Sequence, residues 1–138
     1  KIFLHLFDYT WNMKNYLIIC LCLFSCSPPN FLISSTYQHW VGGLKESGSG
    51  TNYSFKLVAP SEHSTFQVTN VYAHNYKLHF STLPTTYQRG DTLLISGIKS
   101  EENWTSKDLK AKIEYNLHNQ SYSIPIKELR ELDKLYYP

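Results

Sequence analysis

The most reactive side chains in this sequence are three cysteines near one end of the chain, Cys20, Cys22 and Cys26. A thiol can act as a nucleophile, a metal ligand or a disulfide partner. Cys20 and Cys22 would supply half of a structural zinc site, but the sequence has no second cysteine pair to complete the tetrahedron. We therefore predict no metal site at these cysteines and no disulfide in the rest of the chain. Cys26 differs from the other two because of the residues that precede it.

The segment before Cys26 has the order of a secretory leader. Lys14 follows Met13 and gives a positive start, the run 16–24 is mostly apolar, and the small residue Ser25 stands next to the cysteine. A membrane-spanning helix needs about 20 apolar residues, so this short run favours a segment that is cleaved off. The competing interpretation is one hydrophobic helix from the first residue onwards, and polar residues scattered through that stretch argue against it.

Leu23-Phe24-Ser25-Cys26 resembles the lipobox of bacterial lipoproteins. The resemblance implies that Cys26 becomes the first mature residue, receives lipid through its sulfur and its amine, and holds the protein on a membrane face. Pro28 and Pro29 follow and are typical of an extended tether. The predicted organisation is an upstream extension outside the native protein (1–12), a signal peptide (13–25), the lipidated cysteine and tether (26–36), and one folded domain (37–138).

Downstream of the tether, polar and apolar residues alternate with a period of two, which is typical of half-buried strands. Tyr53, Phe55 and Leu57 share one face, whereas Ser54 and Lys56 take the other. Glycine, proline and asparagine clusters separate the runs. The predicted strands are 37–41, 52–59, 66–81 with a break near 73–75, 92–99, 109–117 and 121–126. In the third run, the face expected to be buried contains Tyr72, His74, Tyr76, Leu78 and Phe80.

These strands predict an all-β fold, a small antiparallel β-sandwich that is either immunoglobulin-like or opened into a barrel. The one helical candidate is the segment 125–135, where apolar residues recur at every third position and predict a short C-terminal helical turn. A length of 138 residues suits one domain behind a hydrophobic signal segment. With 13 basic and 11 acidic residues, the net charge is only +2, which disfavours a nucleic-acid partner.

No pattern in the folded part predicts catalysis. His74 and His79 are five residues apart, so on one strand they would point to opposite faces and could not share a metal. The glycine-rich stretch 42–50 precedes a strand pattern rather than the helix N-terminus that a phosphate-binding loop requires. Because Gly-x-Ser-x-Gly is also missing, we predict no catalytic residues, no metal site and no cofactor.

Aromatic side chains give the only positive signal for binding. We predict Trp40, Trp104, Tyr136 and Tyr137 as binding residues, since aromatic rings anchor protein and glycan contacts well. The competing interpretation is that these rings fill the core of a domain that has no disulfides. It weighs more for Trp40 than for Trp104, which stands in a polar loop.

Three segments together resemble small uncharacterised lipoproteins of flavobacteria and related Bacteroidota: Trp40-Val-Gly-Gly43, the block 48–56, and the closing stretch from Ile124 to Pro138. The resemblance covers most of the mature chain and implies lineage and location, but no activity. The residue after Cys26 is Ser27, not the aspartate that retains lipoproteins in the inner membrane of enteric bacteria. The implied placement is an outer-membrane lipoprotein that faces the periplasm, with surface display left open.

We therefore predict a lipid-anchored module of the cell envelope that works by binding rather than catalysis. Its expected partners are the membrane, through the lipid on Cys26, and an envelope protein for which it serves as accessory subunit or scaffold. The alternative is a periplasmic carrier of a small apolar or glycan ligand, and an envelope enzyme ranks third. An exposed aromatic patch would favour the scaffold, whereas a buried apolar cavity would favour the carrier.

Overall fold

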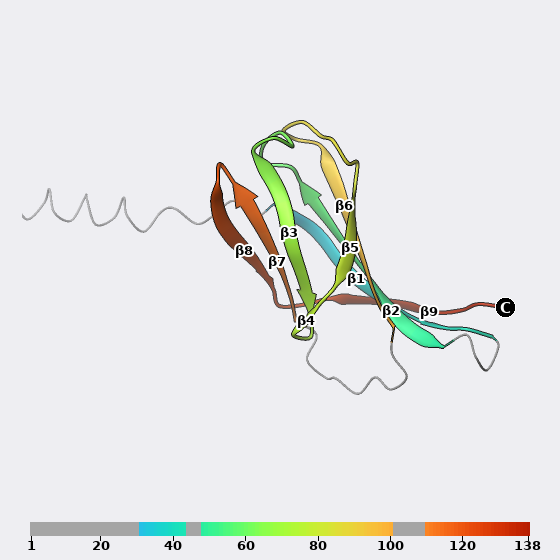
Figure 1. The fold of residues 1–138 in the computed structure, drawn as a ribbon. Coiled ribbons are helices and arrows are strands. Elements are labelled where there is room, and N and C mark those ends of the chain that lie inside the picture. The colour runs from blue at the N-terminus through green and yellow to red at the C-terminus, as the bar shows by residue number, and fades with distance from the viewer. Residues whose placement is uncertain (1–30, 44–47, 101–109) are drawn as a thin grey trace, which may run out of the picture. The chain divides into compact units, whose positions relative to one another are not determined.

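The computed structural model describes residues 31–43, 48–100 and 110–138 (Figure 1). These residues form nine strands and contain no helix. The strands are β1 (Leu32–Val41), β2 (Ser49–Val58), β3 (Phe66–Ala73), β4 (Tyr76–Lys77), β5 (His79–Leu83), β6 (Thr92–Ser100), β7 (Ala111–Leu117), β8 (Gln120–Ile126) and β9 (Arg130–Tyr136).

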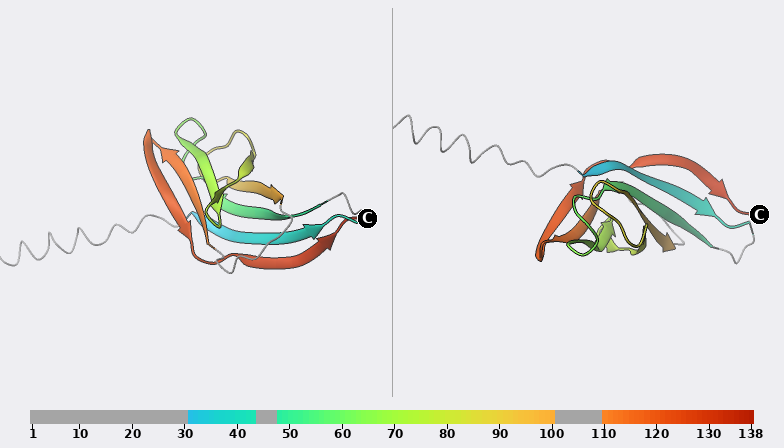
Figure 2. Two further views of the ribbon diagram at one scale, coloured as in Figure 1. Left: turned by 60° about the horizontal axis from the view of Figure 1, so that its bottom comes forward. Right: turned by 90° about the horizontal axis from the view of Figure 1, so that it is seen from above.

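The strands form two sheets that pack face to face, which confirms the predicted small all-β sandwich. The first sheet has the order β5-β6-β2-β1-β9 and the second has the order β4-β3-β7-β8. All neighbours are antiparallel except β1 and β9, which run parallel. Both views in Figure 2 show the end of β1, the start of β2 and the end of β9 extending past the second sheet. We call this part of the first sheet the overhang.

Period-two alternation places the core as the sequence predicts. Phe55 and Leu57 on β2 are fully buried, and so is Ile113 on β7. Each strand turns these apolar side chains toward the opposite sheet because successive residues point to opposite faces. Apolar burial of this kind contributes about 25 cal/mol for each Å² removed from water. The apolar side chains packed between the two sheets therefore provide the main stabilisation of the fold.

The third predicted run is divided by a tight turn, and part of its expected buried face is wrong. His74 and Asn75 both have positive φ values, 50° and 68°, as a two-residue hairpin turn requires. Val71 and Ala73 face the core, whereas Tyr72 lies on the other side of β3 and Tyr76 is 58% exposed. The expected break near 73–75 is confirmed. Before the break, the buried and exposed faces of the strand are the reverse of the prediction.

The C-terminal helical turn is also wrong, because 130–136 form strand β9. Gln38 pairs with Leu132 and Trp40 pairs with Leu135, so one residue of β1, His39, stands opposite two residues of β9. Such a bulge puts residues three apart on the same face of a strand. The three-residue leucine spacing that resembles a helix is therefore the signature of a bulged strand.

The predicted boundary between tether and domain is wrong, because 32–36 belong to β1, which begins at Leu32 rather than at Tyr37. Leu32 pairs with Leu57 across to β2, and the carbonyl oxygen of Phe31 accepts a hydrogen bond of 2.8 Å from the backbone N–H of Val58. Phe31 and Leu32 also pack against the core. Burial of these two apolar side chains favours a strand in this segment. The two prolines further upstream had instead indicated an extended linker.

Candidate binding surface on the overhang

The structure describes three of the four predicted binding residues, and all three lie at the end of the overhang. Trp40 is on β1, Tyr136 is the last residue of β9, and Tyr137 follows it. Parallel pairing of β1 with β9 aligns Val41 with Tyr136. The first and the last of the described strands are therefore neighbours in the sheet. Trp104 and Cys26 lie outside the described residues.

On the outer face of the overhang, the indole of Trp40 lies across Gly50 on the neighbouring strand. A Cβ atom at Gly50 would stand 2.7 Å from the indole Cζ2 and 2.6 Å from the carbonyl oxygen of Lys99. Only glycine leaves room for both neighbours. This close packing explains why Trp40 is half-buried although it points away from the core.

Tyr137 packs against the same indole and holds the end of the chain in place. The two ring centroids are 6.1 Å apart at an interplanar angle of 72°, an edge-to-face contact. The backbone N–H of Tyr137 donates a hydrogen bond of 3.0 Å to the carbonyl oxygen of Val41. At Gly43, a Cβ atom would stand 2.6 Å from the carbonyl oxygen of Tyr137, so this second glycine permits the close approach.

Two leucines of β9 extend this surface. Leu132 and Leu135 pair with Gln38 and Trp40 and therefore share the outer face with the indole. Their exposed fractions are 37% and 36%, and Tyr137 is 49% exposed. We call Trp40, Leu132, Leu135 and Tyr137 the aromatic surface. Tyr136, which is 74% exposed, points to the other side of β9 and is not part of it.

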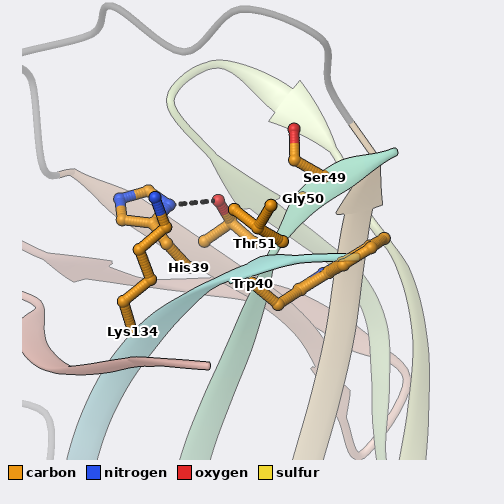
Figure 3. A pocket seen from close by; sticks show the side chains of 7 residues that line it. His39, Trp40, Ser49, Gly50, Thr51 and Lys134 are labelled. Atoms are coloured by element: carbon orange, nitrogen blue, oxygen red, sulfur yellow. Dashed lines mark hydrogen bonds between the residues drawn. The ribbon is translucent and has the colours of Figure 1, made fainter. Parts of the chain in front are cut away.

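The inner face of the overhang has a different chemistry (Figure 3). His39 and Thr51 make a hydrogen bond of 2.8 Å between Nδ1 and Oγ1, and Thr51 is only 2% exposed. Figure 3 shows these two side chains on one side of β1 and Trp40 on the other side. A pocket of about 220 Å³ lies here. It is lined by His39, Trp40, Val41, Ser49, Gly50, Thr51 and Lys134.

Buried and charged groups on this inner side perturb one another. Burial, then a hydrogen bond with Glu131, then the negative charge of that carboxylate raise the pKa of Tyr37 to about 12. Burial lowers the pKa of Lys99, whose ammonium lies 3.3 Å from the ring centroid of Tyr76. Tyr37 thus stays neutral and forms a hydrogen bond with Glu131. Lys99 makes a cation–π contact with the Tyr76 ring.

A separate polar network covers the exposed face of the second sheet. Lys112 makes an ion pair of 2.7 Å with Glu114, and the side-chain amide of Asn70 donates a hydrogen bond of 2.9 Å to the same carboxylate. These two hydrogen bonds, with that of Lys112 first, lower the pKa of Glu114. Both charged groups are exposed to water, so the network contributes little to stability.

No protein-family model, curated protein or solved structure matches this chain. Within the described ranges, no group of three His, Cys, Asp or Glu side chains could hold a metal ion. In the same ranges, no helix has the length and apolar character needed to cross a bilayer. The site is therefore interpreted from its own geometry.

The sequence did not identify the inner face as a candidate site. His39, Lys99 and Lys134 are far apart in the sequence and belong to no short motif. They meet because β9 crosses to the first sheet and pairs in parallel with β1. No local pattern encodes this pairing, so the aromatic rings were the only usable signal.

Proposed function

We propose that this protein is a lipid-anchored binding module of the bacterial cell envelope, which holds an envelope protein partner and performs no catalysis itself. The lipobox resemblance at Cys26 supports the anchor. The placement that it implies is the outer membrane, on the periplasmic side, in a bacterium related to the flavobacteria. The aromatic surface supports the binding role, and it is the observation that carries the proposal.

The aromatic surface has the properties of an interface centre. Aromatic side chains contribute strongly to protein interfaces because they bury a large area with few rotatable bonds. Here the rings are already fixed, since Trp40 lies on Gly50 and Tyr137 packs edge-on against the indole. These side chains would therefore lose little conformational entropy when a partner binds. The adjoining leucines add exposed apolar area around the rings.

The mode of binding that we propose is contact through side chains on the face of the sheet. β9 is an edge strand, and an edge strand is able to recruit a partner strand. However, β9 carries charges at Arg130, Glu131, Asp133 and Lys134 and contains the bulge. Charged residues and bulges at an edge disfavour strand addition, so the partner is expected on the outer face.

The alternative function, a carrier of an apolar ligand, is less well supported because the interior of the domain is filled with side chains. Phe55, Phe66, Leu93, Ile95 and Ile113 occupy the space between the sheets and are fully buried. An apolar ligand would have to displace these side chains, and opening a packed core costs several kcal/mol. A glycan ligand on an exposed face would not meet this obstacle.

The binding role is tested by recovering the protein from native envelopes under mild conditions. Replacing Leu135 and Tyr137 together with serine is expected to reduce the recovered partner at least tenfold, because two central apolar contacts cost about 1 kcal/mol or more each. The amount of partner is measured by quantitative mass spectrometry. The matched control is Leu83→Ser, since Leu83 is 56% exposed on β5 at the other edge of the sheet. Equal recovery from both variants would contradict the proposed surface.

The anchor is tested by the mass of the native protein. We expect the mature polypeptide to begin at Cys26 and to carry acyl groups on its sulfur and its amine. Mass spectrometry of the N-terminal peptide measures both properties. The Cys26→Ser variant should lack the acyl mass and leave the membrane fraction, whereas Cys22→Ser should behave like the parent. A native chain that begins upstream of Cys26 and has no acyl mass would refute the lipoprotein assignment while leaving the partner test intact.

A further inference from the structure

The inner face of the overhang carries basic and hydroxyl side chains on four neighbouring strands. Thr51 on β2 pairs with Lys99 on β6 and with His39 on β1. Directly paired residues point to the same face of a sheet. Lys134 on β9 lines the same pocket as His39, and Figure 3 shows its side chain running beside the imidazole. We call Lys99, Thr51, His39 and Lys134 the cationic row.

The side chains of the cationic row are held in place by their neighbours. Thr51 is buried, and its hydroxyl makes the 2.8 Å hydrogen bond that fixes the ring orientation of His39. The ammonium of Lys99 rests on Tyr76 at 3.3 Å, and that of Lys134 lies 5.5 Å from the ring centroid of Tyr136. A preorganised site loses less conformational entropy when a ligand binds.

The charge of this face favours an anion. Glu131 is the acidic residue of β9 that interacts with Tyr37 on this side, and the tyrosine hydroxyl takes up its carboxylate. Lys134 thus brings a positive charge to the pocket beside the imidazole of His39, and Lys99 on β6 pairs with Thr51. Lysine binds phosphate as a point charge, and charge-assisted hydrogen bonds are about twice as strong as neutral ones.

We propose that the cationic row binds the phosphate group of a phosphorylated ligand. The pocket of about 220 Å³ is smaller than the 300–1,000 Å³ typical of sites that enclose a whole small molecule. It has room for one charged group, with the rest of the ligand outside. Trp40 of the aromatic surface also borders this pocket, but the side chains of the cationic row are not part of that surface. The inference therefore goes beyond the proposed function and does not depend on it.

A phosphate group on a soluble ligand and one on a lipid headgroup would present the same charge to the row. Titration with soluble and with micellar probes distinguishes the two sources.

The test is a titration of the full chain in neutral detergent, followed by the NMR signals of the His39 imidazole. Inorganic phosphate and glucose 1-phosphate are the soluble probes, and micelles doped with phosphatidylglycerol are the lipid probe. We expect saturable shifts with both soluble probes and a dissociation constant about fivefold higher in Lys99→Gln and in Lys134→Gln, as loss of one charged contact predicts. Lys56→Gln is the matched control, because Lys56 is exposed on the outer face of β2.

The outcomes separate the phosphate site from its alternatives. Shifts of His39 caused by the doped micelles, but not by the soluble probes, would identify the phosphate as that of a lipid headgroup rather than of a soluble ligand. No shift with tens of millimolar of any probe would refute the site, as would equal weakening by Lys56→Gln and Lys134→Gln. Unfolding curves of the variants should match that of the parent, which separates lost binding from lost folding.

Discussion

Replacing Phe66 with alanine is expected to lower the free energy of unfolding by about 3–5 kcal/mol, as fully buried Phe→Ala changes do. Phe66 is 0% exposed, and its ring centroid lies 5.3 Å from that of Tyr115 and 6.2 Å from that of Tyr87. The substitution leaves a cavity between Tyr87 and Tyr115, which come from different parts of the chain. Domains are stable by about 5–15 kcal/mol, so this loss is a large share of the total.

Urea unfolding of the full chain, followed by circular dichroism, measures this effect. The matched control is Ile98→Ala, because Ile98 is apolar but 58% exposed on β6, and surface substitutions usually change stability by about 0.5 kcal/mol or less. A loss below about 1 kcal/mol for Phe66→Ala would show that the two sheets do not pack on this ring as described.

Replacing Gly50 with valine is the second change with a large expected effect, a destabilisation of about 1–3 kcal/mol of the kind produced by overpacking. Valine favours strands, so propensity alone predicts the opposite sign. The new Cβ would stand 2.6 Å from the Lys99 carbonyl oxygen and 2.7 Å from the Trp40 indole. The backbone of Lys99 is held by its hydrogen bonds to β2 and cannot easily move away, so the Trp40 indole must be displaced. We therefore expect reduced partner binding as well as reduced stability.

Unfolding midpoints and partner recovery are both measured for Gly50→Val. Ser49→Val is the control, since it makes a similar change at the preceding position of the same strand. The double variant Trp40→Ala/Gly50→Val should recover part of the stability, because removing the indole relieves one of the two close contacts. It should not recover partner binding. A Gly50→Val protein with the parent's stability and binding would exclude the described packing of Trp40.

Local alternation was sufficient to predict much of the fold. Phe55 and Leu57 share a buried face, as do Ile113 and Tyr115, because period-two burial is a property of each strand alone. β9 could not be predicted in this way. Its leucines at 132 and 135 are three apart only because a bulge opposite His39 adds one residue. A bulge depends on the partner strand, and the partner here is the first strand of the domain.

The candidate surface was predictable in its residue types but not in its arrangement. Trp40, Tyr136 and Tyr137 were selected as aromatic residues beyond the needs of the core, and the structure puts them on neighbouring strands. The sequence did not reveal that Tyr136 faces the opposite side from Trp40. It also did not reveal the role of Gly50, which falls outside the predicted strand 52–59 although it lies within β2. Both properties depend on non-local pairing.

The parallel pairing of β1 with β9 also determines when the overhang can work during synthesis. β1 is made first and β9 last, so a ribosome must finish nearly the whole domain before Trp40 can meet Leu135 and Tyr137. Contacts between such distant parts of a chain form late in folding. An incomplete or prematurely terminated chain would lack the strand that completes both faces. Both faces of the overhang are thus complete only in chains that contain β9.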